Sequence, residues 1–227
     1  MDASNLKIAV LLPCMNEELT VGEVVKSFLH ELPDSTVYVC DNASSDQTAK
    51  KALEAGAQVT FEQTPGKGRV LRRMFADIDA DIYVLADGDG TYDPREAPHM
   101  IKELIEGGFD MVAGARESLN ELTRRGHSFG NRIFNRLYRF LFTSNFSDIF
   151  TGYRVLSKRL VKSFPAASSG FEIETELAVH ASQLSLPTLE IPISYGERPL
   201  GSQSKLKTFS DGFRILHSML TLLKENR

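Results

Sequence analysis

Two aspartates, Asp87 and Asp89, follow a short apolar stretch and are separated by a single glycine, Gly88. On an extended strand, residues two apart point to the same face, so we expect the two carboxylates to converge on one point. Neighbouring carboxylates repel each other unless a cation neutralises them, and Gly88 leaves room for a ligand close by. Mg²⁺ or Mn²⁺, with a diphosphate and water completing its oxygen shell, is the cation that fits best. An acidic turn at a strand end, without any ligand, is the alternative interpretation.

The sequence around these aspartates alternates between strand and helix patterns, and these elements must position them. Continuously apolar stretches that are too short for helices alternate with stretches whose apolar residues recur at helical spacing. This alternation predicts an α/β fold with a mostly parallel central sheet flanked by helices. Asn16 is expected to cap the first helix, with Glu17 in its first turn. We expect strands at 7–13, 36–40, 57–62 and 80–87, and helices at 16–32, 45–56 and 66–78.

The alternation weakens after about Asp93, but the remaining patterns are interpreted as part of the same sheet. In such sheets, ligands bind beyond the carboxyl ends of the strands. We expect helices at 94–108, 124–145, 171–184 and 204–226, and strands at 110–116, 147–158 and 187–195. This rule places three polar segments at the carboxyl edge of the sheet, namely 13–17, 41–42 and 87–89.

Composition excludes several classes of function. The chain carries 26 basic and 30 acidic residues, and its net charge of −4 gives no reason to expect nucleic-acid binding. The first residues lack a basic segment followed by an apolar one, and no stretch reaches the ~18 apolar residues that cross a bilayer, so we expect a cytoplasmic protein. Cys14 and Cys40 are expected to be reduced and buried, and not to bind a metal.

The last predicted helix carries an apolar stripe with basic residues beside it. A stripe of this kind is most often core or an oligomer contact, which keeps a homodimer open as an interpretation. Basic amphipathic helices also rest on anionic lipid, so peripheral contact with the inner face of the plasma membrane is the alternative. The stripe consists of Leu206, Phe209, Phe213, Leu216, Leu220 and Leu223.

Several segments together resemble the family 2 glycosyltransferases of the GT-A fold, in particular the branch that makes polyprenyl- or dolichyl-phosphate sugars. Each segment is weak alone, but their order and spacing cover nearly the whole chain. The resemblance implies one GT-A domain over 1–227, with a nucleotide-sugar-binding half at about 1–93 and an acceptor-side half at about 94–227. The segments are LLPCMNEE, DNASSDQT, GKG, DGDGTYDP, GAR, SDIFTGYRV, GFEIETEL and GERPLGSQSKLKTFSDG.

The resemblance implies a nucleotide-sugar donor, without deciding between UDP and GDP. Asp87 would lie nearer the nucleotide and Asp89 would bind the metal. Lys67, at a predicted helix start, suits a diphosphate on charge grounds, although a solvated lysine is an equal alternative. The chain lacks the P-loop and Rossmann fingerprints, which argues against an NTPase or a dehydrogenase. The residues implied for the base and ribose are Pro13, Asn16, Glu17 and Asp41.

Arginines and neighbouring polar residues carry the resemblance on the acceptor side. Arg116 resembles the family arginine that faces the acceptor phosphate, and a polar group suited to a phosphate follows it. The helical phase does not decide whether Arg124 or Arg125 points inward. Glu174 is interpreted either as a contact to sugar hydroxyls or as an acid at a helix start. The other implied residues are Arg125, Ser128, Asn131, Asp148, Thr151 and Arg154, with Arg198 and Lys205 on a segment that closes over the diphosphate.

The leading hypothesis is a metal-dependent, inverting glycosyltransferase with a polyprenyl-phosphate acceptor. A phosphate monoester is mostly ionised near neutral pH, because its second pKa is about 6, so no strong general base is required. If the acceptor is instead a soluble or glycan hydroxyl, a base is needed, and Asp148 or Glu174 is the candidate. A non-catalytic sugar-nucleotide-binding module is the third alternative.

Overall fold

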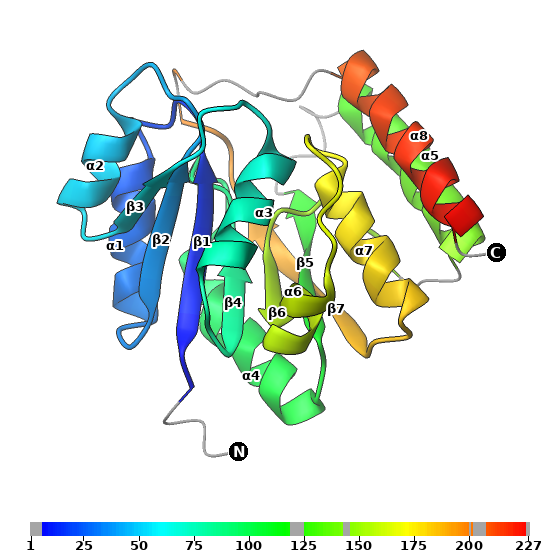
Figure 1. The fold of residues 1–227 in the computed structure, drawn as a ribbon, viewed down its shortest axis with the longest axis horizontal. Helices are drawn as coiled ribbons and strands as arrows, with labels where there is room; N and C mark the ends of the chain where they lie inside the picture. Colours follow the sequence, from blue (N-terminus) through cyan, green and yellow to red (C-terminus); the bar gives the residue numbers. More distant parts are fainter. Residues whose placement is uncertain (1–5, 119–124, 143–145, 200, 202–207, 226–227) are drawn as a thin grey trace.

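Seven strands form one sheet at the centre of the computed structural model, which describes residues 6–118, 125–142, 146–199, 201 and 208–225 (Figure 1). The strand order across the sheet is β3-β2-β1-β4-β6-β5-β7. β6 is antiparallel to β4 and β5, and the other strand pairs are parallel, so the expected mostly parallel sheet is confirmed. The bounds are β1 Ile8–Cys14, β2 Thr36–Asp41, β3 Gln58–Phe61, β4 Ile82–Leu85, β5 Met111–Ser118, β6 Arg154–Ser157 and β7 Thr188–Tyr195.

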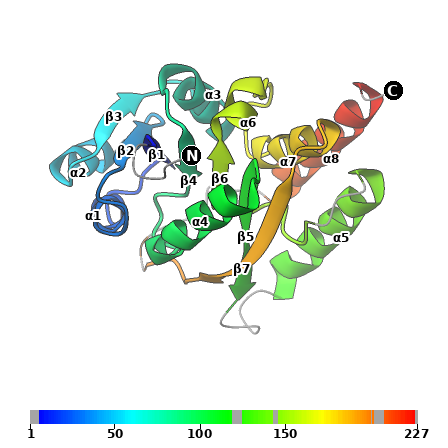
Figure 2. The ribbon, with the colours of Figure 1, turned by 90° about the horizontal axis from the view of Figure 1, so that it is seen from below.

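Helices cover both faces of this sheet. α1 and α4 lie on one side, and α3 and α6 on the other (Figure 2). Along β1, Ala9 and Leu11 belong to the core on the α3 side, while Val10 and Leu12 belong to the core on the α1 side. Burial on both faces explains why the strands are continuously apolar. The helices are α1 Val21–Glu31, α2 Thr48–Glu54, α3 Lys67–Asp77, the 3₁₀ helix η2 Pro94–Glu96, α4 Ala97–Gly107, α5 Arg125–Phe142, α6 Lys158–Ser163, α7 Ile173–Gln183 and α8 Thr208–Glu225.

One edge of the sheet collects the segments that the sequence singled out. β1, β2 and β4 run in the same direction, so the segments that follow them leave at the same edge. β5 and β7 also end there, because β6 is antiparallel to both β4 and β5. The chain order reverses at β1, which lies between β2 and β4. Such a reversal point is where open α/β sheets bind ligands.

The expected helix start at Asn16 is wrong. α1 begins at Val21, and Asn16 has a left-handed backbone with φ 53°. Its side-chain oxygen accepts a hydrogen bond from the Ser45 amide at 2.8 Å, and its own amide donates to Ser44 Oγ at 2.9 Å. Glu17 therefore lies in a loop and not in a first helical turn. Hydrogen bonds to the loop after β2 outweigh the local capping preference.

Two expected strands are shorter than their apolar patterns. β4 ends at Leu85, so Asp87 and Asp89 lie beyond the strand, and the extended geometry expected for them is wrong. The strand expected at 147–158 is confined to β6, and the short helix α6, which the pattern missed, follows it directly. Ser157 caps α6 by accepting a hydrogen bond from the Leu160 amide.

The apolar side of α8 faces the rest of the protein. α8 packs against α7 and lies beside α5 (Figures 1 and 2). Ile215 and Met219 are buried, whereas Leu220 of the expected stripe is 46% exposed, so the stripe was predicted slightly out of phase. Among the described residues, no helix combines the length and apolar character needed to cross a membrane.

The start of α3 packs closely on the loop before α7. Gly66 has φ 143°, and a Cβ at Gly66 or Gly68 would lie 2.3 Å from a backbone carbonyl oxygen of Ser169 or Ser168, respectively. The Gly68 amide donates to the Ser169 carbonyl at 3.1 Å. The two glycines of the GKG segment thus allow two backbones to touch.

Gly68→Ala tests this contact. We expect it to lower the free energy of unfolding by about 1–3 kcal/mol, because a backbone must move to admit the methyl group. Gly212→Ala on α8 is the matched control: its nearest neighbouring atoms lie 3.7 Å away. Alanine there should be neutral or stabilise by up to about 1 kcal/mol, as expected within a helix. Urea denaturation measures both, and equal losses would contradict the contact.

Candidate active site

The loops after β1 and β2 are joined by hydrogen bonds, and Asp41 lies at their junction. Asp41 is 4% exposed, and its Oδ1 accepts from the Ser44 amide at 2.9 Å. Its Oδ2 is buried without a hydrogen-bond partner among the described residues. A buried carboxylate oxygen without a donor is costly, so this atom is suited to accept from a ligand N–H or hydroxyl.

Four carboxylates of the predicted donor site act electrostatically on the buried thiol of Cys14. Burial raises the pKa of this thiol well above its usual value, and the negative charges of Glu17, Asp87, Asp41 and Asp89 raise it further. Gly88 gives the thiol its space, since a Cβ there would lie 2.3 Å from Cys14 Sγ. The structure therefore gathers these acids at one place. Cys14 and Cys40 are both free and buried, as expected.

Lys67 joins two of the predicted site carboxylates. Its ammonium lies 2.5 Å from Asp87 Oδ1 and 2.6 Å from Glu174 Oε1, and its side chain is only 8% exposed. Burial alone would lower the pKa of Lys67, but the two carboxylates hold it well above its usual value. Burial raises the pKa of Glu174, and the Lys67 ammonium opposes that rise. The solvated lysine that the sequence left open is excluded.

Asp89 is engaged at both carboxylate oxygens. Its Oδ1 accepts from the amide and the hydroxyl of Thr91, at 3.1 and 2.6 Å. Its Oδ2 lies 2.7 Å from the guanidinium of Arg198, beyond the end of β7. Thr20 fixes the same turn by donating to the Gly88 carbonyl at 2.7 Å. Sequence reasoning missed Thr20 and Thr91, since single threonines carry no distinctive pattern.

Arg116 on β5 is paired with Asp148. Its Nε and a terminal nitrogen lie 2.6 and 2.8 Å from the two carboxylate oxygens, a bidentate arrangement. Burial would lower the pKa of Arg116, but Asp148 keeps it well above its usual value. The guanidinium also lies over the Tyr195 ring, 5.4 Å from its centroid. Glu190, which sequence reasoning missed, accepts from the Asp148 amide at 2.9 Å and so orients the turn that carries the carboxylate.

Thr151 and Arg154 lie beneath this turn. Thr151 is 0% exposed and Arg154 is 1% exposed. The Arg154 guanidinium donates to the carbonyls of Ile149 at 2.8 Å and Thr151 at 3.1 Å. Burial lowers its pKa from the usual value. The expectation that both residues face the acceptor is therefore corrected, since their polar atoms support the turn from inside.

The remaining predicted residues fall into two groups. Pro13 is half-buried at the end of β1, and Glu17 is buried, with its amide donating to Thr48 Oγ1 at 2.8 Å. The other group has side chains outside the described part of the structure. Arg125, Ser128 and Asn131 belong to it although their backbone lies on α5, and Lys205 belongs to it entirely.

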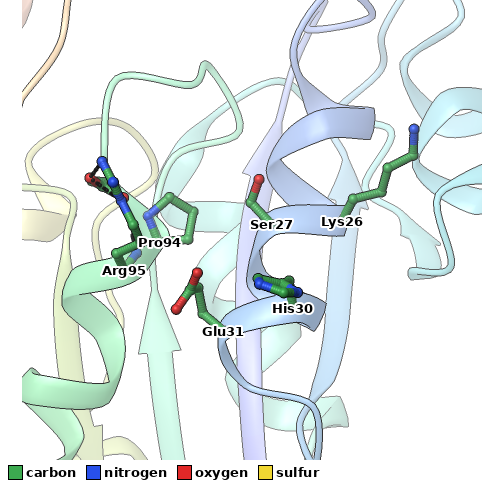
Figure 3. Close-up of a pocket in the computed structure, with 7 residues that line it drawn as sticks. Lys26, Ser27, His30, Glu31, Pro94 and Arg95 are labelled. Atoms are coloured by element: carbon green, nitrogen blue, oxygen red, sulfur yellow. Dashed lines mark hydrogen bonds and ion pairs between the residues drawn. The ribbon is translucent and has the colours of Figure 1, made fainter.

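Two cavities lie outside this cluster. One, of about 330 Å³, lies between α1 and η2 and is lined by residues such as His30 and Arg95 (Figure 3). The other, of about 610 Å³, is lined by Gly66, Ser168 and Arg214 among others. Neither is lined by Asp87 or Asp89, whose oxygens contact protein cations and hydrogen-bond donors instead.

A metal ion fits this cluster only if a further ligand supplies part of its coordination shell. In the described part of the chain, no three His, Cys, Asp or Glu side chains form a ready metal site. Mg²⁺ and Mn²⁺ accept that situation, because they bind through one or two carboxylates and complete their shell with phosphate oxygens and water. The hard carboxylates of Asp87 and Asp89 are suitable donors.

Removing the Lys67 charge tests the buried cluster. We expect Lys67→Met to lower the free energy of unfolding by about 3 kcal/mol near neutral pH, because two carboxylates lose their counter-ion. The loss should shrink as pH falls, since a protonated Glu174 needs no counter-ion, and Lys67→Met/Glu174→Gln should recover part of it. Lys158→Met removes an ion pair that is about half exposed and should cost less than about 1 kcal/mol. Urea denaturation at two pH values measures these effects, and a pH-independent loss would contradict the assignment.

Comparisons with known proteins identify the family of this chain. The family model described as glycosyl transferase family 2 matches residues 9–164. The glycosyltransferase AglJ of Haloferax volcanii is 34% identical over 222 residues, which cover 96% of this chain and 73% of that protein. A dolichyl-phosphate hexose transferase of the same organism is 28% identical over 222 residues, covering 97% of this chain and 95% of that protein.

A solved structure matches the fold over most of the chain. It is glucosyl-3-phosphoglycerate synthase from Mycobacterium tuberculosis in complex with Mn²⁺, uridine diphosphate and glucosyl-3-phosphoglycerate. The TM-score is 0.80 at 22% identity, and the match covers 97% of this chain and 81% of that one. From the family model and the relatives, the chain belongs to glycosyl transferase family 2, and it is a glycosyltransferase with the GT-A fold.

Proposed function

We propose that this glycosyltransferase moves a sugar from a UDP- or GDP-sugar to the phosphate of a polyprenyl-phosphate lipid, with Mg²⁺ or Mn²⁺ as cofactor and with inversion at the sugar. The relative named dolichyl-phosphate hexose transferase supports the lipid-phosphate acceptor, because the match spans nearly the whole of both chains. The Mn²⁺ and uridine diphosphate in the related crystal structure support the class of donor and cofactor.

The donor would bind at the loops after β1, β2 and β4. The unpartnered Asp41 Oδ2 is suited to accept from the base or ribose, with Pro13, Asn16 and Glu17 around it. Asp87 and Asp89 would hold the metal, which supplies a Lewis acid for the negative charge that develops on the leaving diphosphate. Lys67 and Arg198 are the cations within reach of those two carboxylates, and they add to this stabilisation.

Both candidate general bases are held in ion pairs, and this observation favours a phosphate acceptor over a hydroxyl. A hydroxyl acceptor needs a base, yet Asp148 is held by Arg116 and Glu174 is held by Lys67. Either carboxylate would have to leave its counter-ion before it took a proton. A phosphate acceptor arrives largely ionised, since its second pKa is about 6, and needs only to be positioned. Arg116 is suited to that role if the phosphate takes the place of Asp148, because a guanidinium matches phosphate oxygens in pairs.

A lipid acceptor requires access to a membrane surface. We propose peripheral contact at the inner face of the plasma membrane, where a cytoplasmic nucleotide sugar and a lipid phosphate meet. The buried apolar residues described on α8, Ile215 and Met219, pack into the core and are not available for this contact.

Transfer to lipid is the direct test of the proposal. The protein would be incubated with Mn²⁺, radiolabelled UDP- or GDP-hexoses, and either polyprenyl phosphate or the matching polyprenol. We expect label to enter organic solvent with the phosphate and not with the alcohol. Transfer to an added glycan or other soluble hydroxyl, with none to the lipid phosphate, would favour the alternative acceptor.

Asp89→Ala tests the metal role. We expect it to reduce metal-dependent turnover by at least about 100-fold, because the charge on the leaving diphosphate loses its stabilisation. Asp93→Ala is the matched control, since Asp93 follows in the same segment but pairs with the exposed Arg95. It should stay close to the unsubstituted protein. Initial rates against Mn²⁺ concentration measure both, and a normal rate for Asp89→Ala would refute the metal assignment.

A further inference from the structure

Arg198 occupies the side of Asp89 that a metal would need. The Asp89 side chain is 3% exposed, and its Oδ2 lies 2.7 Å from the Arg198 guanidinium. Thr91 already donates twice to Oδ1. The carboxylate is therefore satisfied by the protein alone, and a cation that approaches Oδ2 has to compete with Arg198.

The segment that carries Arg198 is fastened beside Asp89. The Gly196 amide donates to the Thr91 carbonyl at 2.8 Å, and Tyr195 forms an isolated antiparallel bridge with Tyr92. The two tyrosine rings also pack edge to face, 5.1 Å apart. This attachment keeps the guanidinium at high local concentration next to the carboxylate, so the ion pair forms without a large loss of chain entropy.

The acidic surroundings of Asp89 favour a cation beside it, and Arg198 is the cation in contact with it. The neighbouring carboxylates Glu17, Asp41 and Asp87 all act on the same thiol, so an uncompensated Asp89 would be repelled by its surroundings. A guanidinium and a divalent metal are alternative counter-ions for the same oxygen. They compete for it, because an Asp89 side chain that is only 3% exposed leaves little room for both.

We propose that Arg198 is an internal counter-ion of Asp89 that competes with the metal and is released when the donor arrives. The Arg198 guanidinium then leaves Asp89 and binds the diphosphate, and the metal binds the Asp89 carboxylate in its place. This inference rests on the proposed function, since it needs a nucleoside diphosphate as the second anion. Arg198 thereby makes metal binding and donor binding support each other.

The consequence is a measurable coupling between the two ligands. The affinity of a site that is only partly available is lowered by the available fraction, so Mn²⁺ alone binds weakly while Arg198 covers Asp89. A diphosphate that attracts Arg198 raises the available fraction and with it the Mn²⁺ affinity. The same factor must appear in the affinity for the diphosphate when Mn²⁺ is present.

Mn²⁺ binding to the full chain, followed by electron paramagnetic resonance, tests the exchange. Arg198→Gln should bind Mn²⁺ about tenfold more tightly than the unsubstituted protein when no nucleotide is present. The gain in Mn²⁺ affinity on adding UDP should shrink by a similar factor. Arg198→Lys keeps the positive charge and should retain most of the competition with Mn²⁺ for Asp89.

Arg95→Gln is the matched control, because it breaks an Arg–Asp pair on a nearby segment whose arginine is 77% exposed (Figure 3). It should leave both Mn²⁺ affinities unchanged.

The outcomes separate this inference from the function on which it rests. If Mn²⁺ binds the unsubstituted protein with UDP, but Arg198→Gln shows no tighter binding without UDP, the counter-ion exchange is wrong and the donor site stands. If no variant binds Mn²⁺ even with UDP, the metal-dependent donor site fails and the exchange fails with it. Asp89→Asn should abolish the gain seen in Arg198→Gln, and a gain that persists would place the metal elsewhere and overturn the exchange. Urea denaturation checks that each variant is folded.

Discussion

Repulsion between crowded carboxylates is the constraint on which the rest of this site depends. Asp87 and Asp89 follow β4 at the edge where parallel strands end, and Glu174 of α7 shares the Lys67 ammonium with Asp87. Each of them contacts a protein cation, either Lys67 or Arg198. An edge of this kind is stable only while the counter-ions stay in place, so any ligand that enters must exchange charges and cannot simply add to them.

On the predicted acceptor side, the charge that needs an internal counter-ion is positive. Arg116 is the arginine proposed to face the acceptor phosphate, and an unpaired guanidinium there would bind other anions as well. Asp148 holds it in a bidentate pair, and Glu190 fixes the turn that carries Asp148. The proposed acceptor phosphate would have to compete with the Asp148 carboxylate for Arg116. Such competition favours anions that also make other contacts, which is one way a site rejects free phosphate.

The sequence could predict the sheet, its carboxyl edge and the meeting of Asp41 with Asp87 and Asp89, because strand periodicity and parallel pairing are local patterns with global consequences. It could not predict which cationic side chain pairs with which carboxylate. Lys67 and Glu174 are 107 residues apart, and their contact depends on how α3 and α7 pack. Asn16 failed as a helix cap for a related reason, since hydrogen bonds to a loop 29 residues away outweighed its local preference.

The excess of acids over bases also bears on how the donor arrives. A nucleoside diphosphate sugar is itself an anion, and an edge rich in carboxylates repels it over several ångströms. Paired with a divalent cation, the diphosphate is nearly neutral, and the cation is attracted by the same carboxylates. Under the proposed function, the protein would therefore favour the metal–diphosphate pair over either of its parts. In the proposed complex, Lys67 and Arg198 could turn toward phosphate oxygens without leaving their carboxylates uncompensated, because the metal would replace the charge that they withdraw.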